Sequence, residues 1–473
     1  MKSIYIKYIF VFTTLLILGC ESMVDNLNDN PNQLTLDAID PGLFLNGAEI
    51  SNINIHLGST VSGQRGALNR IGAYYSGQLI GFEQVDFEWY QYNVTNTTFN
   101  WDGYQSVITP MREMRRRTTN NPLYQGISKV LEAHLIGTYA SLFGDIPYSE
   151  AVSDVEEPKF DDQRAVFDEL QILLQDAIAD LENSSGSVII EDFIFDGDRI
   201  KWLESAWTLK ARYYMHTKQY DLAYAAAQNG ISSNGNSMMF NPLDIPGENT
   251  TKNKFYIVLS GGPNTGTGNS YLVQLLDNSS GISRNNAKTD ETARLGYYTI
   301  DPSNPNANLG IANELEPQPL ITYQENLLIL AEAGVRSQSF PTGLGHLNEL
   351  RAFLNTGAFL NSNFSSEPFT YDAYVASDFD AGGIENMDNI NPDRALLREI
   401  IEERYVSGFT TLMPYDDSRR LKKSDMDVAV PFPLNVPTST QNVERFLYPE
   451  DEMFSNQMAP EDPGLFEVTK VNQ

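Results

Sequence analysis

The stretch KWLESAWTLKARYYMHTKQYDLAYAAAQNG, residues 201–230, carries the strongest signal about the fold. Apolar residues recur in it at the spacing of an α-helix, and Thr217-Lys218-Gln219 interrupts the pattern. A short polar interruption of this kind joins two helices that pack as an antiparallel hairpin. We therefore predict a helical hairpin whose core-facing positions are Ala206, Leu209, Tyr213, Leu222, Ala226 and Ile231.

The predicted hairpin resembles a tetratricopeptide repeat, a pair of short helices that stacks on its neighbours. Tyr220, Ala223 and Gly230 stand where such a repeat packs tightly and turns. Two longer apolar stripes upstream also have helical spacing, so we expect two further helices before this hairpin. The first stripe is Leu123, Ile127, Val130, Leu131, Leu135 and Leu142, and the second is Val166, Phe167, Leu170, Leu173, Leu174, Ala177, Ile178 and Leu181.

A further hairpin is predicted to begin at Thr322. This residue and Glu325 match a capping box, in which the two side chains satisfy backbone amides at the start of a helix. The partner helix is expected at about 344–354, after a turn at Gly343. A last helix is predicted over about 394–405 from its apolar face.

Between these helices lie four long stretches, 82–99, 232–270, 278–318 and 360–392, which are rich in Asn, Gly, Pro and aromatic residues. Loops of such length in a compact domain are usually functional or disordered. We therefore predict a mainly α fold, in which a tetratricopeptide-like scaffold of helical hairpins carries long irregular loops and few short strands. Residues 41–473 are expected to form a single domain.

The only cysteine, Cys20, follows an apolar run at the start of the chain. Residues 1–19 have the layout of a secretory signal, and their apolar run Ile9–Leu18 is too short to span a bilayer of roughly 30 Å. The segment Ile17-Leu18-Gly19-Cys20 resembles the bacterial lipobox, which implies that Cys20 is acylated and that 20–40 is a flexible tether. An ordinary cleavable signal with an incidental cysteine is the alternative.

The chain is strongly acidic, with a formal net charge of −30 at pH 7. Nucleic acid needs a basic binding surface, so this charge disfavours it as a partner, and it disfavours anionic polysaccharides more weakly. The basic cluster of Arg112 and Arg115–Arg117 is expected to be a solvated helix face. The four histidines are scattered and form no HExxH pair, so we predict no metal and no cofactor.

Five sequence motifs follow one another along the chain: LFGDIPYSEA at 142–151, KW and LKAR within 201–212, RLGYY at 294–298, PLITYQENLLILAEA at 319–333, and RFLYP at 445–449 with Glu452 and Asn456 after it. Together with the lipobox-like segment, they resemble the motifs of the SusD/RagB family of outer-membrane lipoproteins. They are spread over nearly the whole mature chain, so a chance match of all five is not expected.

Two segments depart from the family pattern. After its Glu-Arg helix the family usually has a tryptophan, whereas this chain has the tryptophan-free segment 414–420. Asp417, Arg419 and Arg420 are expected to keep the salt-bridge role there. The segment 292–295, Thr-Ala-Arg-Leu, replaces the family's DPRL, which suggests a remodelled loop near the expected ligand face.

The resemblance implies a cell-surface nutrient-binding lipoprotein that acts as the lid of a TonB-dependent transporter of the SusC type. Its helices are expected to pack on the transporter, and its loop-rich face is expected to capture an oligosaccharide or, in some members, a peptide. No covalent chemistry is implied. Two other classes stay open: a surface glycoside hydrolase, which would need two carboxylates ~5–10 Å apart, and a tetratricopeptide adaptor with a peptide groove.

Sugar rings are bound by flat aromatic faces together with amides and arginine. The segment 82–93 is the richest in such side chains, and Trp89, Tyr90 and Tyr92 are the main candidates for ligand contact. Anchoring of the loop is the alternative role for these three rings.

Other aromatic residues are assigned by their place in the family motifs. Trp101 and Tyr104 resemble a structural helix start and are expected in the core, and Tyr297 and Tyr298 are expected to be structural as well. Weaker candidates for ligand contact are Tyr271, Arg284 and Asn285.

Overall fold

The computed structural model describes residues 40–58, 67–248 and 250–473. The predicted signal segment 1–19 and Cys20 lie outside these residues, as does nearly all of the predicted tether. In the described part of the chain, no helix is both long enough and apolar enough to cross a membrane.

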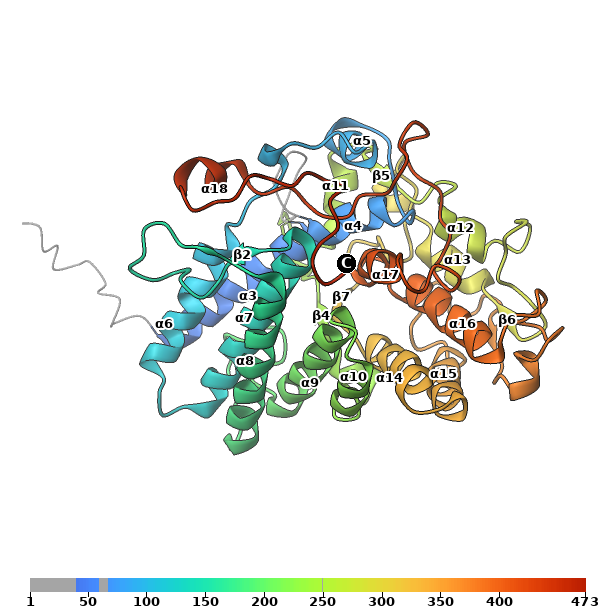
Figure 1. The fold of residues 1–473 in the computed structure, drawn as a ribbon, viewed down its shortest axis with the longest axis horizontal. Coiled ribbons are helices and arrows are strands. Elements are labelled where there is room, and N and C mark those ends of the chain that lie inside the picture. Colours follow the sequence, from blue (N-terminus) through green and yellow to red (C-terminus); the bar gives the residue numbers. More distant parts are fainter. Residues whose placement is uncertain (1–39, 59–66, 249) are drawn as a thin grey trace, which may run out of the picture.

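The scaffold is a row of helices that follow one another in chain order (Figure 1). Consecutive helices pack side by side, because each presents an apolar stripe that needs a partner. This arrangement confirms the predicted scaffold of helical hairpins. One predicted core position is wrong: Leu222 is 41% exposed, because it lies on the outer face of its helix. The helices are α7 (Pro122–Phe143), α8 (Gln163–Asn183), α9 (Arg199–His216), α10 (Tyr220–Ala227), α14 (Tyr323–Ser337), α15 (Phe340–Leu354), α16 (Pro392–Ser407) and α17 (Met413–Arg420).

Short strands and further helices form the rest of the described residues. The described strands pair into four two-stranded antiparallel sheets, β1–β5, β2–β3, β4–β7 and β6–β8, as the prediction of few short strands requires. The strands are Ile80–Gly81, Ile146–Pro147, Phe160–Asp161, Met238–Phe240, Thr265–Gly266, Thr289–Asp290, Gln318–Ile321 and Thr370–Tyr371, numbered β1 to β8. The remaining α-helices are α3 (Pro41–Leu57), α4 (Leu68–Tyr75), α5 (Gln84–Tyr90), α6 (Thr109–Arg117), α11 (Lys254–Ser260), α12 (Tyr271–Leu276), α13 (Thr292–Tyr298) and α18 (Glu450–Ser455).

The second hairpin differs from the prediction at Gly343. This glycine lies inside α15 and makes no turn, and a Cβ atom there would lie 2.1 Å from Cγ2 of Val335. It therefore allows α14 and α15 to pack closely. The predicted capping box is half present: Thr322 accepts from the Glu325 amide at 3.1 Å, but the Glu325 carboxylate accepts from Arg212.

The arginine cluster on α6 also differs from the prediction. Arg112 and Arg115 both pair with Glu132 of α7, whose side chain is almost fully buried. Arg116 and Arg117 pair with Glu113 of their own helix. Arg112 and Arg115 therefore join α6 to α7, and only Arg116 remains largely exposed, as the prediction of a solvated face requires.

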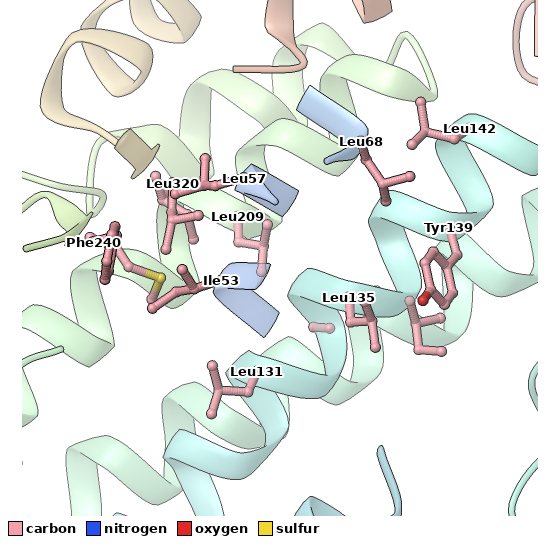
Figure 2. Close-up of a cluster of buried hydrophobic side chains, with 14 of the residues drawn as sticks. Ile53, Leu57, Leu68, Leu131, Leu135, Tyr139, Leu142, Leu209, Phe240 and Leu320 are labelled. Atoms are coloured by element: carbon pink, nitrogen blue, oxygen red, sulfur yellow. The ribbon is translucent and has the colours of Figure 1, made fainter. Parts of the chain in front are cut away.

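The main core lies where α3, α4, α7 and α9 meet the small sheet of β4 and β7 (Figure 2). Leucine, isoleucine and aromatic side chains from these elements interdigitate, and each fully buried one stabilises the fold by roughly 1.5–3 kcal/mol. The core therefore joins segments that are far apart in the sequence. Residues labelled in Figure 2 are Ile53, Leu57, Leu68, Leu131, Leu135, Tyr139, Leu142, Leu209, Phe240 and Leu320.

A buried charge network surrounds the tryptophan-free helix α17. Glu332 of α14 pairs with Arg420 at 2.7 Å, and Arg404 pairs with Asp417 at 2.6 Å. Burial raises the pKa of the Glu332 carboxyl, but the guanidinium groups around it outweigh burial and hold that pKa well below its usual range. Asp417 and Arg420 keep the expected salt-bridge role.

Candidate functional site

Helix α5 is a short segment within the region predicted as a loop, and a buried carboxylate anchors it. The Asp86 side chain is 1% exposed, pairs with Nε of Arg70 at 2.9 Å and accepts from the Tyr74 hydroxyl at 2.7 Å. The backbone of Gly81 also packs closely against the backbone of Asp86, which only glycine permits, because a Cβ atom there would lie 2.0 Å from the Asp86 carbonyl oxygen. The inner face of α5 is thereby fixed to α4.

The backbone at both ends of α5 is held in an uncommon conformation. Gln84 has φ of 51° and Tyr92 has φ of 60°, in the left-handed region that favours glycine. The Tyr92 hydroxyl donates to Oδ1 of Asn442 at 3.0 Å and accepts from the Asn435 amide at 3.2 Å. Such strain persists where surrounding contacts fix it, and it often accompanies functional sites. The C-terminal segment therefore holds α5 in one geometry.

The outward face of α5 exposes aromatic rings and amides. Phe87 is 47% exposed, and Gln84 and Gln91 lie three and four residues from it, so the three side chains share one helix face. Tyr90 is half-buried, with its ring packed edge-on against Tyr74. Phe82, 41% exposed, lies against Gly268 in the loop after β5. We call Phe82, Gln84, Phe87, Tyr90 and Gln91 the α5 surface.

The chemistry of the α5 surface suits a neutral ligand. Burial raises the pKa of the Tyr90 hydroxyl, so this group stays protonated at neutral pH. Glu83 and Glu88 are exposed beside the rings and would repel an anion. Flat apolar faces next to amide donors and acceptors are the groups that a sugar ring needs.

The predicted ligand residues of the 82–93 segment occupy three different environments. Trp89 does not offer a face to solvent: it is 5% exposed, and the Arg70 guanidinium lies 5.5 Å from its ring centre. Its position opposite Phe87 on a short helix turns it inward. Tyr92 is pinned by hydrogen bonds, and Tyr90 belongs to the α5 surface. A ligand contact by any of the three stays a prediction.

The weaker candidates, Tyr271, Asn285 and Arg284, make contacts within the fold. The Tyr271 ring packs against Tyr405, with 6.2 Å between ring centres. Asn285 donates to the Leu276 carbonyl and accepts from the Glu291 amide, so it braces the backbone.

Arg284 is buried among acidic residues, which is an environment unlike the exposed loop that was expected. It donates to Glu403 at 2.6 Å and to Glu399 at 2.9 Å, and it lies 3.1 Å from a carboxylate oxygen of Glu291. The Arg284 guanidinium is therefore paired with carboxylates of the protein itself. A ligand role for Arg284, Asn285 or Tyr271 stays a prediction.

Phe82 and Phe87 are exposed aromatic residues that the sequence analysis did not single out. The signal was present, because a helix over 84–90 places Asp86 and Trp89 on one face and Phe87 on the other. Trp101 is 8% exposed and Tyr104 packs against the core, which confirms their expected positions.

Comparison with known proteins identifies the family. A family model described as starch-binding and associating with the outer membrane, of the SusD-like kind, matches residues 31–343. No curated protein matches the chain.

Solved structures share the fold at low sequence identity. A SusD/RagB family protein from Bacteroides thetaiotaomicron is 20% identical, with a TM-score of 0.62 over 88% of this chain and 94% of that chain. A SusD homologue from Bacteroides fragilis is 18% identical, with a TM-score of 0.66 over 92% and 100% of the two chains. A chitin-binding SusD homologue from Flavobacterium johnsoniae is 15% identical, with a TM-score of 0.63 over 92% and 97%. Because the family model covers most of the sequence, the chain belongs to the SusD-like family.

Proposed function

We propose that this protein captures a neutral oligosaccharide on the α5 surface and delivers it to a TonB-dependent transporter of the SusC type. The single observation that carries the proposal is the exposed Phe87 ring on a helix that Asp86 and Tyr92 hold in place. A rigid, exposed ring binds a sugar face at low cost in conformational entropy. The family description as starch-binding and the chitin-binding structural neighbour support a glycan as the ligand.

We expect binding without catalysis. The α5 surface consists of rings and amides. The buried carboxylate of this helix, Asp86, pairs with Arg70 and Tyr74, and Glu83 and Glu88 beside the rings are exposed to solvent. A glycoside hydrolase would need two carboxylates free to act on the scissile bond. Incubation of the protein with the bound oligosaccharide should leave the oligosaccharide intact, whereas release of shorter products would favour the hydrolase.

The transporter partner and the membrane anchor extend this proposal. The chain from Cys20 to Asp40 reaches at most ~70 Å when fully extended, so an acylated Cys20 would keep the folded part near the outer membrane. Cys20→Ala should move the protein out of the membrane fraction. Native pull-down with the intact lipoprotein should recover a transporter of the TonB-dependent class, and repeated recovery of the lipoprotein alone would contradict the partnership.

Glycan-array binding by the soluble protein truncated before Asn26 tests the ligand class. Neutral oligosaccharides should bind, and the binding should be lost with Phe87→Ala. Capture of peptides with no glycan binding would instead assign the chain a RagB-like, peptide-capturing role.

A further inference from the structure

A cleft distinct from the α5 surface lies between α13, the segment leading into β7, and the loops that follow α15 and α16. Its volume is about 200 Å³, smaller than the roughly 300–1,000 Å³ of drug-sized ligand sites. It is therefore sized for one ring. We call it the α13 cleft and define it by Tyr297, Tyr298, Phe359, Phe409, Glu316 and Gln324, which line it.

Aromatic rings form rigid walls of the α13 cleft. Tyr298 packs against Phe409 with 5.0 Å between ring centres, and Tyr297 lies 5.6 Å from Tyr298. Phe359, on another side, lies 5.2 Å from the Arg294 guanidinium. These contacts fix the rings before any ligand arrives, so little conformational entropy is lost on binding.

A hydrogen-bond acceptor is fixed in the same cleft. The Glu316 carboxylate accepts from the Tyr297 hydroxyl at 2.8 Å and from the Asn361 amide at 2.7 Å. Both of its oxygens are thereby oriented, while each keeps capacity for a further donor. A sugar hydroxyl is such a donor, whereas an anionic group would be repelled.

Two other polar groups of the cleft have no partner. Within residues 40–58, 67–248 and 250–473, neither the Tyr298 hydroxyl nor the Gln324 side-chain amide makes a hydrogen bond to the protein. Tyr298 is only 6% exposed. The Tyr298 hydroxyl is reached by solvent in the cleft, so both groups are free to bond to water or to the hydroxyl groups of a ligand.

We propose that the α13 cleft binds one neutral pyranose ring and is a second sugar site, built from different residues than the α5 surface. The apolar side chain of a peptide would fill the volume but would leave the Tyr298 hydroxyl and the Gln324 amide unsatisfied. A ring that carries hydroxyl groups satisfies them and stacks on the aromatic walls. The inference extends the proposed function, yet it stands on separate residues.

Titration of the soluble protein with the methyl glycosides of glucose, galactose, mannose and N-acetylglucosamine, followed by saturation-transfer NMR, tests the inference. At least one glycoside should bind. Tyr298→Phe removes only the unpartnered hydroxyl and should weaken that binding about three- to tenfold. Ala358→Trp fills the mouth of the cleft from an exposed position and should weaken it by more than about tenfold.

Two matched variants separate this site from the rest of the molecule. Ala352→Trp adds the same side chain at an exposed position of α15 that does not line the cleft, and it should leave glycoside binding unchanged. Phe87→Ala should also leave it unchanged, even if that variant abolishes oligosaccharide capture.

The inference is overturned if none of the four glycosides binds, or if Tyr298→Phe and a folded Ala358→Trp both bind as the parent does. If Phe87→Ala loses glycoside binding while the Tyr298 and Ala358 variants keep it, the glycoside binds on the α5 surface. Binding of the dipeptide Phe-Gly in place of the glycosides would assign the cleft to peptides.

Discussion

Two segments predicted to face ligand, 82–93 and the region around Arg284, lie in opposite environments. In the first, Asp86 points inward to Arg70 and Tyr74, and Phe87 faces solvent. In the second, Arg284 is enclosed by carboxylates and offers nothing to solvent. A residue type suited to ligand binding therefore serves the fold wherever partners surround it, and is available to a ligand only where they do not.

Removal of the Arg284 side chain should strongly lower the stability of the fold. Arg284→Ala leaves Glu399 and Glu403 without their shared cation, and breaking a buried pair in this way costs about 3–5 kcal/mol. The matched control is Arg398→Ala, which breaks the exposed pair with Asp388 and should cost about 0–1 kcal/mol.

Urea unfolding of both variants measures these changes in the free energy of unfolding. If Arg284→Ala unfolds like the parent protein but loses ligand binding, Arg284 is a ligand residue and the contrast between the two segments fails.

Truncation of Trp89 should resemble truncation of a core residue. Both Trp89→Ala and Trp101→Ala remove buried rings, so each should lower the free energy of unfolding by about 3–5 kcal/mol. Phe454→Ala, at a position 83% exposed, should change it by less than about 0.5 kcal/mol. A Trp89→Ala protein with normal melting and weakened ligand affinity would return Trp89 to the binding surface.

Acid should weaken the scaffold before it affects the α5 surface. Burial lowers the pKa of His56 and His216 to about 4, so both are neutral in the folded state. In the unfolded chain they take up protons below about pH 6.5. Because the unfolded state then binds more protons at these positions, the stability that the two histidines contribute falls as pH drops from about 6.5 to 4, with a slope of up to about 1.4 kcal/mol per pH unit for each histidine.

Urea unfolding at pH 7, 6 and 5 measures this loss of stability. Over the same range the α5 surface keeps neutral rings, so ligand affinity should stay constant while the protein remains folded. A stability that does not change between pH 7 and 5 would contradict the burial of neutral histidines.

The sequence predicts the scaffold well because its signals are local. The apolar stripes that define α7 and α8 and the polar break at Lys218 between α9 and α10 each need only a few neighbouring residues to be recognised. Gly343 was misassigned because a glycine that ends a helix and one that admits a neighbouring helix have the same local sequence signal.

The sequence placed the candidate site in the 82–93 segment, and the structure adds which of its rings are buried and which are exposed. The choice of Trp89 over Phe87 depends on which side of α5 faces Arg70, a residue of α4. The burial of Arg284 depends on glutamates more than a hundred positions later in the chain. Contacts over such distances leave no pattern in a single local segment, so only the three-dimensional structure assigns these residues.

The assignment of the α5 surface as the ligand site depends most directly on Phe87. Calorimetric titration of the parent protein, Phe87→Ala and the control Leu222→Ala with the oligosaccharide selected on the array compares an exposed residue of the α5 surface with an exposed residue of α10. Phe87→Ala should weaken binding by about 1–3 kcal/mol, roughly tenfold to a hundredfold, at an unchanged melting temperature, and Leu222→Ala should bind as the parent does. Equal affinity of all three proteins would contradict the assignment of the α5 surface as the ligand site.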